Sequence, residues 1–255
     1  MHGEVKFSIP LQCSHRGPAD VDDALLKALD LGCAANCETI ERLMYALEFV
    51  DLANTDDSLM TERAETILIG SAFEQLLGAN DGAYELGCRF GGLFESYGSV
   101  TVEEARKVRL GIKIDERMRK RADAQLKWYV HRKWIEELYD VRSKSVHEST
   151  ATNRSWGWTP LEHLVMAAWV FPLVVKLLLQ RDGLYTLSDT DKGHCMTVDK
   201  LLAVIDWAER TDYGASMWNN IVSSTVMEYT LTAGLKDCIP PIFNDDSLKK
   251  ESGEP

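Results

Sequence analysis

Arg142 and His147 are the residues of this sequence whose types and spacing most suggest chemistry. They stand five positions apart in the string LYDVRSKSVHE, residues 138–148. An imidazole exchanges protons near neutral pH, and a guanidinium stays charged and can bridge two oxygens of one phosphate. Together the two groups are suited to binding a phosphate and moving a proton beside it.

Helix geometry qualifies this pairing. Five residues on an α-helix correspond to a rotation of about 140°, so the two side chains diverge unless the Arg curls back or the helix breaks. Ser143 and His147 are four residues apart and share a face. With six His in the chain, chance alone can supply the spacing. The ordinary alternative is that Arg142 binds carbonyl groups at a helix end and that His147 interacts favourably with the helix dipole.

The overall composition is typical of a soluble globular protein. A length of 255 residues leaves room for one large domain or two small ones, and the 45% hydrophobic and 27% charged residues are close to average. The N-terminal string MHGEVKFSIPLQ lacks the apolar core of a signal peptide, and the six cysteines form no paired CxxC sets. We therefore expect a cytoplasmic protein with free thiols.

One apolar segment is long enough to raise the question of a membrane span. Its uninterrupted apolar run, residues 164–175, has 12 residues, whereas a span needs about 20. The segment instead predicts a buried core helix bent near Pro172, and no membrane is expected as a partner.

Charge is distributed unevenly along the chain. The net charge is −12, yet residues 106–134 hold 11 Lys or Arg and 3 acidic residues, a local charge of +8. Such asymmetry points to a polyanionic partner. A solvated helix face that pairs with acidic helices explains the same charges.

Several site classes find no support in the sequence. The motifs GxxxxGK[ST], GxGxxG, HExxH and GxSxG are absent, which argues against a P-loop nucleotidase, a Rossmann enzyme, a zincin and an α/β-hydrolase. Cys33 and Cys37 are four apart on an expected helix, but no second pair matches them, so core packing is favoured over metal binding. The string DTDKGHC, residues 189–195, fits no ligand pattern. No metal and no cofactor are expected.

The hydrophobic periodicity predicts an all-α protein, because no alternating strand exceeds a few residues. Thr61 and Thr101 are expected N-caps, Pro160 suits a first helical turn, and residues 181–195 are expected to form a loop. The expected helices cover about 21–53, 60–77, 101–147 with interruptions, 160–179, 196–212 and 215–231. The first helix has apolar residues at helical spacing, as in Leu43, Leu47 and Val50. The expected packed positions are Leu68, Ala72, Phe73 and Leu76 in the second helix and Trp134, Leu138 and Val141 before Arg142.

Two strings resemble one protein family. LYDVRSKSVHE is similar to the signature of HEPN domains, in which an Arg and a His four to six residues apart mark the site, and it is closest to the Apea-like branch. The upstream string ERAETILIGSAFEQLLG, residues 62–78, resembles an earlier helix of the same family. The resemblance covers about residues 40–180. It departs at Glu148, where many members have Gly directly after the His.

The resemblance implies a HEPN-like antiparallel helical bundle with additional flanking helices. Residues 1–20 are then an extended N-terminal segment, residues 21–235 form a single HEPN-like domain with a C-terminal helical extension, and residues 236–255 are a polar tail. No fixed-period repeat and no linker divides the chain.

The resemblance also implies a metal-independent endoribonuclease that acts as a homodimer, a possible toxin or antiviral defence effector. RNA supplies its own nucleophile, the 2′-hydroxyl, so His147 is needed only as general acid or base and Arg142 to stabilise the phosphate. Because cleavage requires both an acid and a base, two copies across a twofold axis complete the site.

Supporting roles are expected for three further residues. Ser143 and Lys144 are secondary contacts to RNA, and Glu74 either orients Arg142 or contacts a partner, although an exposed helix acid explains it equally well. Residues 106–133 are the expected phosphate track. An antitoxin or regulatory partner is possible. The alternative function is a non-catalytic HEPN module that binds nucleotide, RNA or a partner protein through the same cleft.

Overall fold

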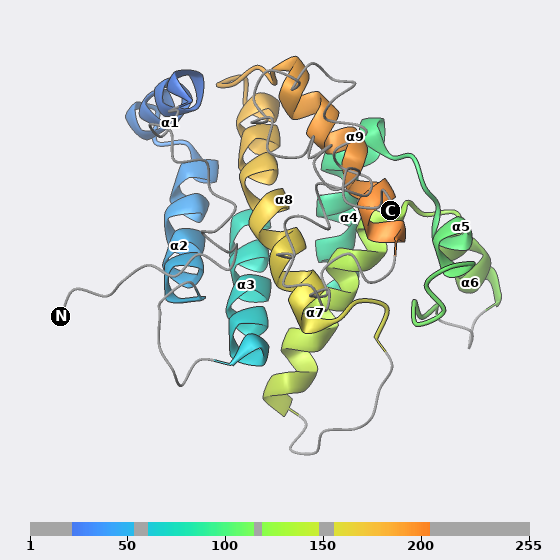
Figure 1. Ribbon diagram of the computed structural model, residues 1–255. Helices are drawn as coiled ribbons and strands as arrows, with labels where there is room; N and C mark the ends of the chain where they lie inside the picture. The colour runs from blue at the N-terminus through green and yellow to red at the C-terminus, as the bar shows by residue number, and fades with distance from the viewer. Residues whose placement is uncertain (1–21, 54–60, 115–118, 148–155, 205–255) are drawn as a thin grey trace, which may run out of the picture.

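The computed structural model describes residues 22–53, 61–114, 119–147 and 156–204, with the backbone alone at residues 119–121 and 144–147. Over these ranges the chain is helical and holds no β-strand, so the expected all-α class is confirmed for the described part of the chain (Figure 1). The helices are α1 (Asp23–Ala34), α2 (Glu38–Ala53), α3 (Glu62–Leu77), α4 (Gly82–Phe94), the short 3-10 helix η2 (Glu95–Tyr97), α5 (Val102–Arg106), α6 (Arg119–Leu126), α7 (Val130–His147), α8 (Pro160–Arg181) and α9 (Asp189–Ala203).

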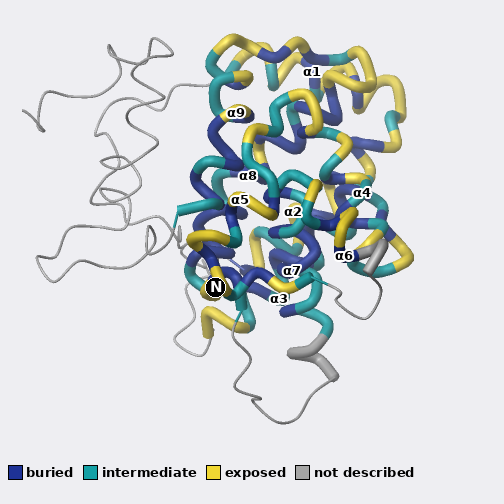
Figure 2. The backbone as a smooth tube through the Cα atoms, turned by 90° about the vertical axis from the view of Figure 1, so that its right-hand side faces the viewer, coloured by how far each residue is buried: buried dark blue, intermediate teal, exposed yellow. Residues whose placement is uncertain are grey.

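The core lies where α3, α4, α7 and α8 meet. Each of these helices contributes one large aromatic ring, and the ring of Phe73 from α3 contacts the other three edge-on. Its centroid lies 6.1 Å from that of Phe90, 5.9 Å from that of Trp134 and 5.4 Å from that of Phe171. These edge-to-face contacts fix the relative placement of the four helices. Figure 2 shows the buried positions concentrated in the middle of the molecule and exposed positions on its outer turns.

Helix starts follow the capping residues of the sequence. Thr61 accepts the Ala64 N–H at 3.2 Å and begins α3, and Thr101 forms a capping box with Glu104 at the start of α5. Pro160 occupies the first turn of α8 as expected. These three predictions are confirmed because capping is a hydrogen bond between residues close in sequence.

The segment expected to be helical over residues 21–53 forms two helices rather than one, because the chain breaks between α1 and α2. Asn36 adopts a left-handed conformation with φ of 51°, which Asn tolerates better than most residues. Cys33 therefore lies on α1 and Cys37 in the turn, and they do not share one helix. Leu43 is buried, whereas Leu47 is 41% exposed, so the apolar residues at helical spacing do not all face the core.

The expected loop over residues 181–195 is wrong in its second half. Ser188 accepts the backbone N–H of Asp191 at 3.1 Å, and the Asp191 carboxylate accepts the Ser188 N–H at 3.0 Å. This capping box starts α9 at Asp189. The local S-x-x-D spacing is the signal that identifies this helix start.

α8 is the one helix in the described part of the chain that is long and apolar enough to cross a membrane by length and composition. It continues through Pro172, an exposed position, as a single helix. Of its most apolar window, 72% is buried inside the protein. That burial is typical of the core helix of a soluble protein, as the sequence predicts.

Candidate functional site

Arg142 lies on the side of α7 that faces α3. Its Nη2 is 3.1 Å from Oε2 of Glu74, and its Nε donates to the Ser71 hydroxyl over 3.5 Å. The guanidinium also lies 5.7 Å from the ring centroid of Tyr139, one turn earlier on α7. The side chain is therefore held between two helices by an ion pair, a long hydrogen bond and an aromatic ring.

Small residues on α3 allow this approach. A Cβ at Gly70 would lie 3.2 Å from the Cβ of Arg142, so a larger residue would push α7 away. Phe73 and Leu76, on the same helix, are almost fully buried and anchor α3 in the core. The sequence pattern that buries one face of α3 thus also presents Ser71 and Glu74 to α7.

The Arg142–Glu74 pair lies at the boundary between core and solvent. The side chain of Arg142 is 31% exposed and that of Glu74 is 18% exposed. Burial raises the pKa of Glu74, and the attraction of Arg142 opposes that rise. The expected contact between Glu74 and Arg142 is present, and part of the guanidinium remains accessible from solvent.

His147 is the last residue of α7, and the helix continues without a break from Arg142 to His147. The two α-carbons are thus separated by about 7.5 Å along the axis and about 140° around it. Ser143 is half-buried beside Arg142. The side chains of Lys144 and His147 lie outside the described part of the structure. The backbone of α7 does not by itself turn Arg142 and His147 toward one another.

The basic segment of residues 106–133 is used in part inside the protein. Arg109 is 4% exposed. Arg132 lies over the ring of Trp128 at 3.5 Å from its centroid and near the carboxylate of Glu136, and Lys133 donates to that same carboxylate over 3.3 Å. These three cations therefore pair with groups of the protein itself and do not form an open phosphate track. Such internal pairing is the alternative that the sequence left open for this segment.

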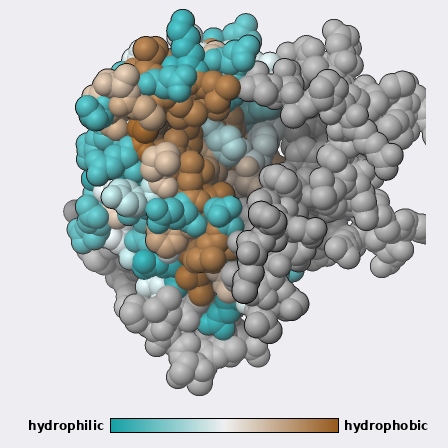
Figure 3. Space-filling model, turned by 90° about the vertical axis from the view of Figure 1, so that its left-hand side faces the viewer, coloured by the Kyte–Doolittle hydropathy of each residue, from teal (hydrophilic) through white to brown (hydrophobic). Residues whose placement is uncertain are grey.

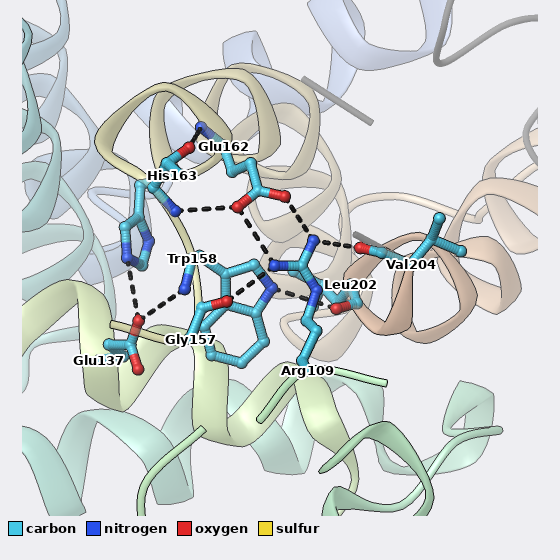
Figure 4. Close-up of polar contacts among 9 residues, drawn as sticks. Arg109, Glu137, Gly157, Trp158, Glu162, His163, Leu202 and Val204 are labelled. Carbon is cyan, nitrogen blue, oxygen red and sulfur yellow. Dashed lines mark hydrogen bonds and ion pairs between the residues drawn. The ribbon is translucent and has the colours of Figure 1, made fainter. Parts of the chain in front are cut away.

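A second polar cluster, which sequence reasoning missed, surrounds Arg109 (Figure 4). Its guanidinium donates to the carbonyl of Gly157 over 2.7 Å, to the Val204 carbonyl and to both oxygens of Glu162. Glu162 is 3% exposed. The cluster joins the segment after α5, the start of α8 and the end of α9.

An open hollow of about 410 Å³ adjoins this cluster. Its lining includes Arg109 and Glu162, which bind one another and neighbouring carbonyls. Trp158 closes one side, and its indole N–H donates to the carbonyl of Leu202 over 3.1 Å. Because Nη1 and Nη2 of Arg109 are paired and only its buried Nε has no hydrogen-bond partner among the described residues, the cluster acts as a structural joint.

Two buried histidines lie beside carboxylates, and neither ring nitrogen of His163 makes a hydrogen bond within the described part of the chain. The Nδ1 of His131 lies 2.7 Å from Oδ1 of Asp199, and that carboxylate also accepts backbone N–H groups from Ser99, Val100 and His131. His163 is 1% exposed, and its Nε2 lies 3.6 Å from Oε1 of Glu137. The sequence gives no signal for either pair, because their partners lie far apart along the chain.

The string DTDKGHC contributes packing and ion pairs. The carboxylate of Asp191 accepts hydrogen bonds from Lys176 at 2.7 Å and Tyr185 at 3.1 Å. Burial raises the pKa of the Cys195 thiol to about 12, so this thiol stays protonated and unreactive near neutral pH. Among the described residues no group of three or more His, Cys, Asp or Glu side chains is arranged to hold a metal ion. Comparison of the chain with family models, curated proteins and solved structures finds no match.

Proposed function

We propose that this protein is a metal-independent endoribonuclease of the HEPN type that acts as a homodimer. The observation that carries the proposal is Arg142, a half-exposed cation held by Glu74 between α3 and α7, on the helix that ends at His147. The two strings that resemble the HEPN family supply these same two helices.

The chemistry follows from the groups on α7. His147 of one copy takes the proton of the RNA 2′-hydroxyl, whose oxygen attacks the adjacent phosphorus. Arg142 stabilises the charge on the phosphate oxygens, and His147 of the second copy protonates the departing 5′-oxygen. The products are a 2′,3′-cyclic phosphate and a 5′-hydroxyl.

The continuous helix is a reason for two copies. Arg142 and His147 of one chain diverge by about 140° on an unbroken α-helix. A twofold axis beside the end of α7 brings the second set of side chains into reach. Glu74 is then a positioning residue that holds the Arg142 guanidinium in place for the RNA phosphate. Ser143 and Lys144 are secondary contacts to the RNA.

The cellular setting belongs to the same proposal. An uncontrolled ribonuclease damages the RNA of its own cell, so a toxin or antiviral defence effector acting in the cytoplasm requires a trigger or an antitoxin-like partner. The described cysteines Cys33, Cys37, Cys88 and Cys195 are all free thiols, in keeping with a reducing compartment.

RNA cleavage in excess EDTA tests the proposal. Arg142→Ala and His147→Ala should each lower kcat by about 100-fold or more. Arg42→Ala is the matched control, because the Arg42 side chain is 27% exposed and paired with Glu38, much as Arg142 is with Glu74. Glu74→Gln should lower kcat less than Arg142→Ala does and leave KM nearly unchanged.

The result that removes the proposal is equal turnover by the native protein and both α7 variants while all remain folded and dimeric. A strictly monomeric active protein contradicts the composite site. Retained RNA affinity without turnover in the native protein instead assigns the alternative, a non-catalytic HEPN module whose cleft serves recognition.

A further inference from the structure

The outward face of α2 carries large apolar side chains that the fold leaves uncovered. Met44 is 60% exposed, Tyr45 49%, Leu47 41% and Leu52 50%. At 100° per residue these four positions lie within an arc of about 160° that also holds Glu41, Glu48 and Asp51, while Leu43, Ala46 and Ala53 lie on the other side, which packs toward α3. α2 therefore exposes several large apolar side chains on the side turned away from α3, with acidic side chains among them.

This face is contiguous and hollowed. An open hollow of about 520 Å³ is lined by Met44, Tyr45 and Leu47 together with Glu41, Glu48 and Asp51. Figure 3 shows the side of the molecule that bears α1 and α2, where hydrophobic side chains form a band bordered by hydrophilic ones. Singly exposed apolar residues are ordinary, but neighbouring ones set among charges of one sign indicate an interaction surface.

The charges on this face determine which kind of partner can bind there. Three of the six lining residues are acidic and none is basic. Arg42, the one cation of α2, pairs with Glu38 at the start of the helix and does not line the hollow. A second copy placed on this face by a twofold axis would bring carboxylates against carboxylates, and an anionic membrane would be repelled in the same way.

We propose that this face of α2 binds an amphipathic helix of a partner protein whose apolar stripe is flanked by Lys or Arg. The apolar side chains of such a helix fill the hollow between Met44 and Leu47, and its cations meet Glu41, Glu48 and Asp51. The face lies on the side of α2 away from α3, so it is separate from the Arg142–Glu74 pair. The inference does not rest on the proposed function.

The test measures binding of a fluorescent Leu/Lys amphipathic peptide of about 18 residues, five helical turns, by anisotropy. A Leu/Glu peptide of the same pattern is the charge-reversed probe. At an ionic strength of about 0.15 M the native protein should bind the Leu/Lys peptide at least about ten times more tightly. Hydrogen exchange should show added protection in α2.

Two variants and two matched controls locate the binding. The double variant Met44→Ser with Leu47→Ser should weaken the Leu/Lys peptide about ten-fold, and Glu48→Lys alone should weaken it about five-fold. Met196→Ser removes a comparably exposed apolar side chain elsewhere, at 51% exposure, and Glu103→Lys reverses an exposed acid on α5. Neither control should change the affinity.

Three results overturn the inference. They are absence of peptide binding, equal affinity for the two peptides, and equal effects of the α2 variants and their controls. Self-association of the native protein that the Met44→Ser, Leu47→Ser variant abolishes assigns the face to a second copy instead. Where the double variant does not fold, Glu48→Lys decides, because it replaces one surface charge and leaves the apolar positions intact.

Discussion

The joint around Arg109 predicts a large and specific loss of stability. Arg109→Met leaves the Glu162 carboxylate buried without its cation, and removing one partner of a buried ion pair costs about 3–5 kcal/mol. The carbonyls of Gly157 and Val204 lose a donor as well, at about 1–3 kcal/mol for each group left buried and unpaired. We therefore expect a loss of at least about 4 kcal/mol.

The partner substitution completes a double-mutant cycle. Glu162→Gln removes the charge but keeps a side-chain oxygen that can accept the Thr159 N–H, which the carboxylate now accepts at 2.9 Å. Alone it leaves Arg109 as an unpaired buried cation, so a loss of about 3 kcal/mol is expected. The double variant buries no charge, and its loss should fall short of the sum of the single losses by about 2 kcal/mol or more.

Urea unfolding followed by tryptophan fluorescence is a suitable assay, because the Arg109 guanidinium lies 5.6 Å from the ring centroid of Trp158. Arg42→Met is the control, since a solvent-exposed pair contributes only about 0–1 kcal/mol. A loss below about 1 kcal/mol for Arg109→Met would refute the claim that the pair is a buried joint. Additivity of the single substitutions within about 0.5 kcal/mol would refute their coupling.

Two further predictions concern backbone packing and acid stability. A Cβ at Gly111 would lie 2.3 Å from the Trp156 carbonyl oxygen, whereas a Cβ at Gly92 within α4 meets nothing within 4 Å. In thermal or urea unfolding, Gly111→Ala should therefore cost about 1–3 kcal/mol and Gly92→Ala should stabilise by about 0.5–1 kcal/mol; equal effects would contradict the close approach. Burial alone would raise the pKa of Asp191. Hydrogen bonds from Lys176 and from the Ser188 hydroxyl outweigh that effect, so the pKa is lowered. The contribution of Asp191 to stability is present above the unfolded pKa near 3.8 and is lost as the pH falls through the lower native pKa. Lys176→Met should therefore flatten the loss of stability that thermal unfolding measures from about pH 5 downward; an unchanged acid profile would show that this ion pair does not set it.

The candidate site shows how far sequence reasoning extends. The apolar spacing of α3 correctly predicts that Ala72, Phe73 and Leu76 are buried, and the apolar spacing before Arg142 correctly predicts that Trp134 anchors α7. The contact between Glu74 and Arg142 depends on the packing of α3 against α7, 68 residues apart in sequence, and on the close approach at Gly70. The spacing of residues along the chain does not reveal how closely α3 and α7 pack at this contact.

The sequence alone determined the all-α class of the described residues and the helix starts at Thr61, Thr101 and Pro160. These features depend on hydrogen bonds and apolar periodicity within a few residues, which the order of amino acids states directly. Only the tertiary structure decided that Arg109 is buried and that Leu47 is exposed. The partner of Arg109 lies 53 residues away, and an apolar side chain is covered only where another element packs on it.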